Sequence, residues 1–279
     1  MGKKITWVIL ILFAFIMFYP IIFLVTGSFM SAVELKGYFK SVLEGTSGYA
    51  SFGLLPRFPT LRSYIDLLLD SPEFFLMFWN SVKLTVCILL GQLLVGVPAA
   101  WGFARYDFPL KKIIFTIYIV LMMMPFQVTM LSSYLVLDKI NMIDTHGSII
   151  LPAVFSTFPI FIMYRFFCGI PDSIIESAKI DGAGAIQIFR YFGIPLGSAG
   201  IVSVLVLNFL EYWNLIEQPL AFLKNRELWP LSLYLPNIGL DSAGTAFAAS
   251  VITLIPAVFV FLSGQDYLEQ GIVASAIKE

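Results

Sequence analysis

Six polar or aromatic side chains lie in stretches of the sequence that are otherwise apolar, and they are the residues best suited to contact a polar solute. They are Gln127, Asn208, Glu211, Tyr212, Trp213 and Asn214. Polar groups in long apolar stretches are costly and usually face the interior of a helix bundle. Asn208, Glu211 and Tyr212 lie three to four residues apart, so one helix face could carry all three. The six residues are therefore candidates for lining a solute pathway.

Such a surface suits a sugar. Amide and carboxylate groups exchange hydrogen bonds with hydroxyl groups, while aromatic rings cover the C–H faces of the sugar. The alternative is that these side chains bond neighbouring helices, or that Tyr212 and Trp213 anchor the chain near a membrane boundary. Both interpretations stay open on the residues alone.

No combination of residues in the sequence predicts catalysis or a bound cofactor. There is no Gly-x-x-x-x-Gly-Lys-Ser/Thr run to hold ATP phosphates, and the glycine pair Gly91 and Gly96 lies within an apolar stretch. His146 has no neighbouring His or Cys, and Cys87 and Cys168 lie in apolar segments, where a thiol packs as a small hydrophobic group. We expect no metal, no cofactor and no enzymatic activity in this chain.

The composition predicts a protein that is dissolved in lipid. Of 279 residues, 59% are hydrophobic and 13% charged, a balance unsuited to a soluble domain. The formal net charge of -1 gives no basic field for nucleic acid. Six apolar stretches are long enough to cross the membrane as helices, and the first is too long for a secretory signal peptide. They lie near residues 5–29, 79–104, 112–136, 147–168, 196–216 and 245–264.

Short clusters of Lys and Arg predict the orientation of these spans. Clusters at Lys3 and Lys4, between spans two and three, between spans four and five, and at Lys278 share one face, which is expected to be cytoplasmic. Both termini are then cytoplasmic. The opposite face carries the long loop 31–78, with a turn at Gly45 to Gly48 and a helix-like stretch over 61–69. We expect this loop to be ordered, as a cap or a docking surface.

The connector between spans four and five, residues 169–195, predicts two short helices outside the membrane. Ser173 and Glu176 have the spacing of a capping box, so a helix is expected to begin there, and Gly182 can end it in the left-handed conformation. A second helix is expected from Ala185 to Phe192. The apolar side chains of the first helix need a cover, which a partner protein could provide. These are Ile174, Ile175, Ala178 and Ile180.

The same connector resembles the EAA loop of binding-protein-dependent ABC importer permeases. Glu176-Ser177-Ala178, then Gly182, then Phe192-Gly193-Ile194-Pro195 match the usual form of Glu-Ala-Ala, three residues, a glycine, and later Ile-x-Leu-Pro. Ser177, Phe192 and Ile194 depart from that form but keep small or apolar character. Further segments over most of the chain are similar to sugar permeases of the maltose type. These are residues 104–108, 124–127, 143–146, 180–183, 211–214 and the tail 270–278.

The resemblance implies an all-α polytopic membrane protein, with six transmembrane helices and a cytoplasmic coupling helix in a single permease domain over residues 1–279. The coupling loop, 169–195, is then expected to dock on a separate ATPase, although Glu176 could instead serve only to cap its helix. The residues implied in this coupling are Glu176, Ser177, Ala178, Asp181, Gly182 and Ala183.

The resemblance also implies partners and a location. The partners are a second permease, identical or different, two ATP-binding subunits, and an extracellular or periplasmic solute-binding protein that delivers a sugar. The location is the bacterial cytoplasmic (inner) membrane.

Two other functions were weighed against this one. A secondary transporter driven by an ion gradient typically has inverted repeats and interior carboxylates or histidines, and this sequence has one such carboxylate, Glu211, and no convincing repeat. An intramembrane enzyme needs a catalytic group at depth, for which the sequence offers no motif.

Overall fold

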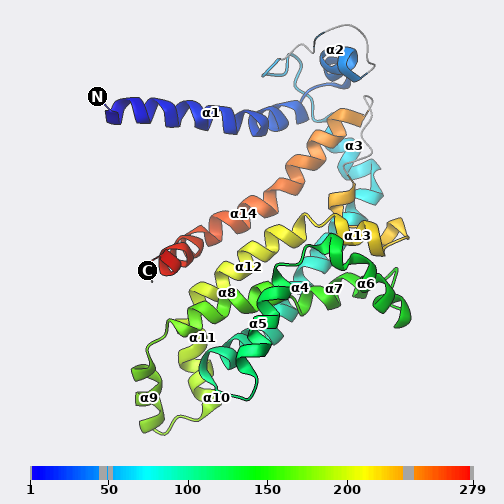
Figure 1. Cartoon of the computed structure of the whole chain (residues 1–279). Helices are drawn as coiled ribbons and strands as arrows, with labels where there is room; N and C mark the ends of the chain where they lie inside the picture. Colours follow the sequence, from blue (N-terminus) through cyan, green and yellow to red (C-terminus); the bar gives the residue numbers. More distant parts are fainter. Residues whose placement is uncertain (1, 44–48, 50–52, 235–241, 277–279) are drawn as a thin grey trace. The chain divides into compact units, whose positions relative to one another are not determined.

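The computed structural model describes residues 2–43, 49, 53–234 and 242–276, which form helices joined by short connections (Figure 1). No β-strand occurs among these described residues, as the all-α prediction requires. The chain divides into two compact units, Met1–Phe78 with Leu233–Pro256, and Trp79–Ser232 with Ala257–Glu279. The expected turn at Gly45 to Gly48 and the cationic Lys278 lie outside the described residues.

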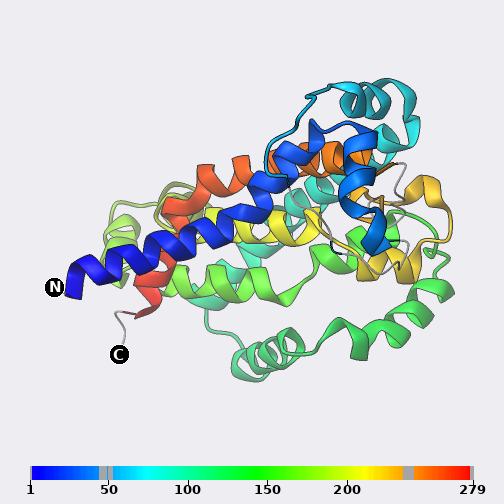
Figure 2. The ribbon, with the colours of Figure 1, turned by 90° about the horizontal axis from the view of Figure 1, so that it is seen from above.

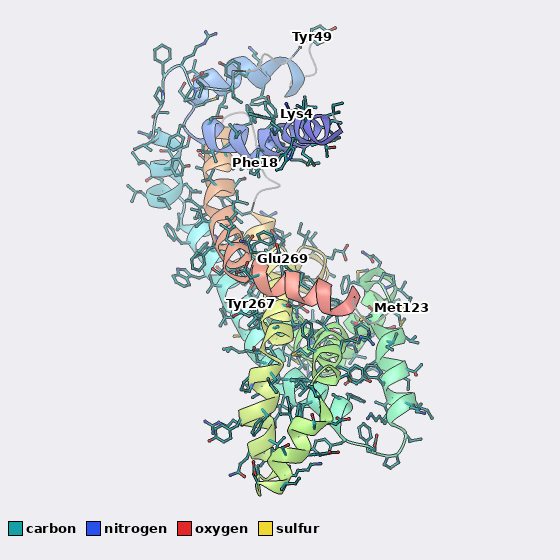
Figure 3. The ribbon with its side chains drawn as sticks, turned by 90° about the vertical axis from the view of Figure 1, so that its left-hand side faces the viewer. Lys4, Phe18, Tyr49, Met123, Tyr267 and Glu269 are labelled. Atoms are coloured by element: carbon teal, nitrogen blue, oxygen red, sulfur yellow. The ribbon has the colours of Figure 1, made fainter. Side chains whose placement is uncertain are left out.

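The first unit contains the first span and most of the long loop that follows it. Its helices are α1 (Gly2–Ser28), α2 (Ala32–Leu43) and α3 (Arg62–Asp70), with the first residues of α4 (Pro72–Arg105) and of α14 (Ala243–Ala276). α3 covers nearly all of the stretch 61–69 that its pattern predicts to be helical. In α1 the most apolar window has a mean hydropathy of 3.0 and buries none of its residues. Figure 3 shows side chains standing out around α1, where Lys4 and Phe18 are labelled. Such a surface requires lipid.

The long loop is ordered where it is described, because it has a small core of its own. Met30, Leu35 and Ala243 are buried together, with Phe39 and Phe247 packed against them. Two further contacts tie the loop to the end of α1. The Ser28 and Tyr64 hydroxyls are 2.8 Å apart, and the Thr60 N–H donates to the Phe29 carbonyl over 2.8 Å.

The second unit contains the remaining helices, and the breaks between them decide its shape. They are α5 (Lys111–Met122), α6 (Phe126–Lys139), α7 (Gly147–Val154), α8 (Thr157–Cys168), α9 (Asp172–Ile180), α10 (Ala185–Ile188), a π-helical turn (Phe189–Gly193), α11 (Ile194–Leu196), α12 (Ser198–Trp213), α13 (Glu217–Phe222) and 3₁₀ turns at Arg226–Leu228 and Leu231–Leu233.

The third apolar stretch, 112–136, is divided into two helices. α5 and α6 are bent by 107° at the break between them and are separate segments in Figure 2. Pro125 has no N–H to donate, and it disfavours helical geometry at Met124, so the helix stops there and restarts at Phe126. Within the described residues, four helices are long and apolar enough to span a membrane, or up to six if each bent pair is one span. The polytopic α-helical fold class is confirmed.

Glycines on α12 allow it to approach α8 closely. A Cβ at Gly197 would overlap the Phe167 ring, and one at Gly200 would overlap Phe166. Next to this contact, the Ser203 hydroxyl donates to the carbonyl of Tyr267 over 2.8 Å, in the part of α14 that belongs to this unit (Figure 3). The small residues of α12 therefore serve helix packing, as is usual in membranes.

Replacing Gly200 by alanine should destabilise this unit. The added methyl group meets an aromatic ring that is itself packed, and such overpacking costs about 1–3 kcal/mol. Gly102→Ala in α4 is the matched control, because nothing lies within 4 Å of its Cβ position. The measurement is the thermal unfolding midpoint of the detergent-solubilised protein by circular dichroism. Equal midpoints for the two variants would contradict the close packing of α8 and α12.

Candidate functional site

The connector 169–195 forms two short helices, and the first begins one residue earlier than predicted. α9 starts at Asp172 after Pro171, whose backbone is extended (φ -60°, ψ 137°). The predicted capping box of Ser173 and Glu176 is wrong, because no side chain caps α9 and the Ser173 carbonyl accepts the hydroxyl of Ser177 instead, over 2.8 Å. Proline supplies the required extended entry without an N–H that would need a cap.

The end of α9 follows the prediction. Gly182 has φ +83°, in the left-handed region that favours glycine. Its N–H donates to the Lys179 carbonyl over 3.0 Å, and the Ala183 N–H donates to the Ala178 carbonyl over 2.9 Å. This pair of bonds is a Schellman motif, which satisfies the last free carbonyls of the helix and turns the chain sharply. Gly182 is therefore required by the turn itself, whatever binds beside it.

The residues expected to couple to an ATPase divide into an exposed set and a buried set. Glu176, Ser177 and Asp181 are exposed, whereas Ala178 is buried in the core of the second unit together with Ile175. The apolar face of α9 is thus partly covered by its own chain. Two apolar side chains of the connector remain uncovered within the described residues: Ile180 is 85% exposed and Ile186 in α10 is 80% exposed.

Arg105, at the end of α4, holds the entry of the connector. Its side chain is 10% exposed and donates to the Asp172 carboxylate over 2.6 Å, to the Phe167 carbonyl over 2.7 Å, and to the Ile170 carbonyl. The two carbonyls lie at and just beyond the end of α8, where no further helix turn satisfies them. The sequence presented Arg105 only as a positive charge between two spans. Nothing in the sequence pairs it with residues more than 60 positions away.

Trp101, one turn before Arg105, holds the exit of the connector. Its ring packs edge-on against Phe167 and against Phe189, which begins the π-helical turn. A Cβ at Gly193 would lie 2.8 Å from the Trp101 ring, so only glycine allows the chain to pass so closely. Both ends of the connector are therefore fixed to neighbouring side chains of α4, and its tip lies at one end of the second unit (Figure 1).

Three of the six candidate pathway residues are engaged in helix contacts. Asn208 is 1% exposed and donates its amide to Gln92 over 2.7 Å, while the Gln92 amide donates to the Ala153 carbonyl over 2.9 Å. Trp213 is buried against Phe209. Asn214 donates to the Leu210 carbonyl of its own helix over 2.9 Å. For these three, the structure favours the helix-bonding alternative.

Glu211 and Tyr212 line a cavity of about 530 Å³ in the second unit. The Tyr212 hydroxyl accepts a hydrogen bond from the Gln92 amide over 3.3 Å, so the same buried network orients the wall of the cavity. Gln127 does not line the cavity and donates to the Glu217 carboxylate over 2.6 Å. The rest of the wall comes from the segments around the α5–α6 and α7–α8 breaks and from α13. It includes Thr129, Ser133, Ser148, Ser156, Thr157, Gln218, Phe126, Phe155, Phe158 and Phe222.

Asp144 fixes α13 beside this cavity. Its carboxylate accepts the N–H groups of Lys224 and Asn225, both over 2.8 Å, and its own N–H donates to the carbonyl of Phe222 over 2.9 Å. The hydrogen bonds from Asn225 and Lys224 hold the pKa of Asp144 below its ordinary value, so the group stays ionised at neutral pH. The segment after α13 is thus tied down at its beginning.

His146 and Asn80 hold the remainder of that segment. His146 Nε2 is hydrogen-bonded to the Leu228 carbonyl over 3.1 Å, and burial lowers the pKa of His146. Asn80 on α4 donates to the carbonyls of Glu227 and Trp229, over 2.6 and 3.1 Å. His146 is thus a structural residue of a connection, as its sequence context predicts.

A family model described as "Binding-protein-dependent transport system inner membrane component" matches residues 92–274. The chain belongs to this family. The matched region includes the cavity, the connector and the part of α4 that carries Trp101 and Arg105. The resemblance that rested on the connector is therefore confirmed, and the chain is a transport subunit whose ATPase is a separate protein.

Individual relatives extend the match to almost the whole chain. The arabinooligosaccharides transport system permease protein AraQ of Halalkalibacterium halodurans is 26% identical, over 98% of this chain and 96% of that protein. The sn-glycerol-3-phosphate transport system permease protein UgpE of Yersinia enterocolitica is 28% identical, over 74% of this chain and 75% of that protein.

A solved structure of similar fold is a chain of a bacterial ABC transporter involved in the import of the acidic polysaccharide alginate. It has a TM-score of 0.81 and 22% identity, and the match covers 95% of this permease and 96% of that chain. At this identity the likeness concerns the fold alone.

Removing Arg105 should loosen the entry of the connector. Arg105→Ala leaves the Phe167 and Ile170 carbonyls without their charged donor, and each such bond contributes about 1.5–3 kcal/mol. Hydrogen–deuterium exchange in residues 169–180 should then become at least about tenfold faster. Asp172→Asn should have a small effect, below about 1 kcal/mol, because that carboxylate is 84% exposed.

Lys111→Ala is the control for the loss of a positive charge at this end of the unit. Lys111 pairs with Asp107 over 3.1 Å, an exposed carboxylate outside the connector. If Lys111→Ala and Arg105→Ala changed exchange in residues 169–180 equally, the assigned role of Arg105 would be wrong.

Proposed function

We propose that this permease is one of two membrane subunits of an ATP-driven importer, and that it carries a sugar or oligosaccharide across the bacterial cytoplasmic membrane. In this proposal both termini and the connector 169–195 lie in the cytoplasm. The observation that carries the proposal is the connector, whose base is fixed to α4 by Arg105 and Trp101 and whose tip is exposed. A segment of this kind can transmit a push from an attached protein into the membrane helices.

The exposed tip has the mixed character of a docking surface. Ile180 and Ile186 offer apolar side chains, and Glu176, Lys179 and Asp181 surround them with charges of both signs. An apolar centre with a polar rim is the usual anatomy of a protein interface. We assign Glu176, Ser177, Asp181, Gly182 and Ala183 to this contact or to the turn that shapes it. Ala178 is assigned to the support of α9 from within.

The proposed assembly follows from what the chain lacks and from its family. The sequence has no phosphate-binding loop, so two ATP-binding subunits must supply the energy. A second permease, identical or different, completes the pathway, and a solute-binding protein outside the membrane delivers the cargo. One solved relative of similar fold, at 18% identity and a TM-score of 0.58, is a bacterial alginate ABC transporter in complex with an alginate pentasaccharide-bound periplasmic protein.

A carbohydrate cargo is supported by the cavity. Its wall combines hydroxyl groups, an amide and a carboxylate with the rings of several aromatic residues. Hydroxyl groups of a sugar can bond the former, while the rings cover its C–H faces. The arabinooligosaccharide and alginate transporters among the relatives support the same class of cargo.

Uptake into vesicles loaded with ATP tests the proposal. Glu176→Lys reverses a charge at the docking surface, and Gly182→Pro is incompatible with φ +83° and removes the N–H that bonds Lys179. Both variants should lower ATP-driven uptake at least about tenfold, which corresponds to about 1.4 kcal/mol of lost coupling. Asp107→Lys is the control, because this exposed carboxylate lies outside the connector, and its uptake should stay near that of the unaltered transporter.

An ionophore distinguishes the competing function. ATP-driven uptake should continue when the ion gradients are collapsed. Uptake that stops with the ionophore while ATP remains, or that persists in both connector variants, would favour a secondary transporter and overturn the proposal.

A further inference from the structure

The cavity in the second unit has a charge pattern that can select cargo. Glu211 is the single ionisable carboxylate among the side chains that line it, and no Lys, Arg or His belongs to that lining. The other polar groups are hydroxyls and one amide. The cavity volume of about 530 Å³ lies within the range of about 300–1,000 Å³ that is usual for small-molecule sites.

The carboxylate is held in place by a rigid wall. Glu211 lies next to Tyr212, whose hydroxyl is bonded to Gln92, and Gln92 is in turn bonded to Asn208 on the same helix as Glu211. Across the cavity, α13 contributes Gln218 and Phe222, and Asp144 bonds the backbone there. The negative charge is therefore presented at a defined position in a confined, partly apolar space, where water screens it weakly.

We propose that this cavity binds an uncharged saccharide segment and that Glu211 is its specificity-determining residue. The carboxylate accepts hydrogen bonds from neighbouring sugar hydroxyls and repels carboxylate or phosphate groups on a cargo. The inference rests on the proposed function for the identity of the cargo as a sugar. It separates this permease from transporters of similar fold or sequence that are named for an acidic polysaccharide and for sn-glycerol-3-phosphate.

The expected discrimination follows from the distance at which a bound anion would meet Glu211. Two like charges about 5 Å apart at an effective dielectric constant of about 20 repel strongly enough to change affinity by 10- to 100-fold or more. Glu211→Gln removes that repulsion and keeps the shape and hydrogen-bonding capacity of the side chain. Selection against anions should then disappear while neutral cargo still fits.

Thiol labelling of the assembled transporter tests the field of Glu211 without knowledge of the cargo. Ser133→Cys places a thiol in the cavity wall, in a background where Cys87 and Cys168 are replaced by serine, since both are exposed. Labelling rates are compared for a cationic and an anionic methanethiosulfonate of similar size. The ratio of cationic to anionic rates should be at least about tenfold higher than for a small thiol in solution, and Glu211→Gln should reduce that excess several-fold.

Glu217→Gln is the matched control, because Glu217 is an exposed carboxylate on α13 that does not line the cavity. It should leave the ratio unchanged. A ratio that is insensitive to Glu211→Gln, or equally sensitive to Glu217→Gln, overturns the assignment of Glu211.

Uptake of paired cargo tests the saccharide itself. Neutral oligosaccharides are compared with the same compounds oxidised to a carboxylic acid at the reducing end, and Glu211→Gln should raise uptake of the acids relative to the neutral forms by about tenfold or more. Every variant receives cargo from the same solute-binding protein, so the change in ratio reports on the permease. Acids imported as well as neutral forms by the unaltered transporter would overturn the inference. If ATP drove no uptake at all, the proposed function would fail, while the labelling ratio would still decide the role of Glu211.

Discussion

Hydrocarbon offers no hydrogen-bond partner to a peptide group, and this constraint determines where the chain can leave the helix. In the second unit the helices break at Pro125 and between α7 and α8, and both breaks border the cavity. The carbonyl of Ala153, at the second break, accepts the Gln92 amide. A polar residue in the middle of α4 thus compensates for the interrupted helix, and the space beside the break becomes available to a solute.

α4 connects the functional parts of this unit. Near the start of the unit, Asn80 holds the segment that follows α13. About three turns later, Gln92 holds the wall of the cavity, and at the end of the helix Trp101 and Arg105 hold the connector. Each attachment is made by a side chain whose bonds are directed, so a movement of the connector has a defined mechanical route toward the cavity. A helix is suited to this role because its internal hydrogen bonds resist bending.

The connector shows how one short motif can serve folding and docking together. The small side chain of Ala178 packs into the core, Gly182 supplies the backbone turn, and Glu176 between helix and solvent stays available to a partner. A substitution in such a motif can therefore act through the shape of the connector or through the contact surface. Burial separates the two cases, since a buried residue cannot touch another protein without a rearrangement.

The sequence by itself determined the solvent of this protein, the approximate positions of its apolar stretches and its family. Those features depend on composition, on the length of apolar runs and on local backbone chemistry, such as the left-handed turn at Gly182 or the helix near residues 61–69. Only the tertiary structure decided which polar residues face a cavity. Asn208 and Glu211 lie three positions apart, yet one is bonded to Gln92 and the other lines the cavity. The roles of Arg105 and Asp144 likewise depend on partners about 60 to 80 residues away, because the contacts that define them exist only after the helices have packed.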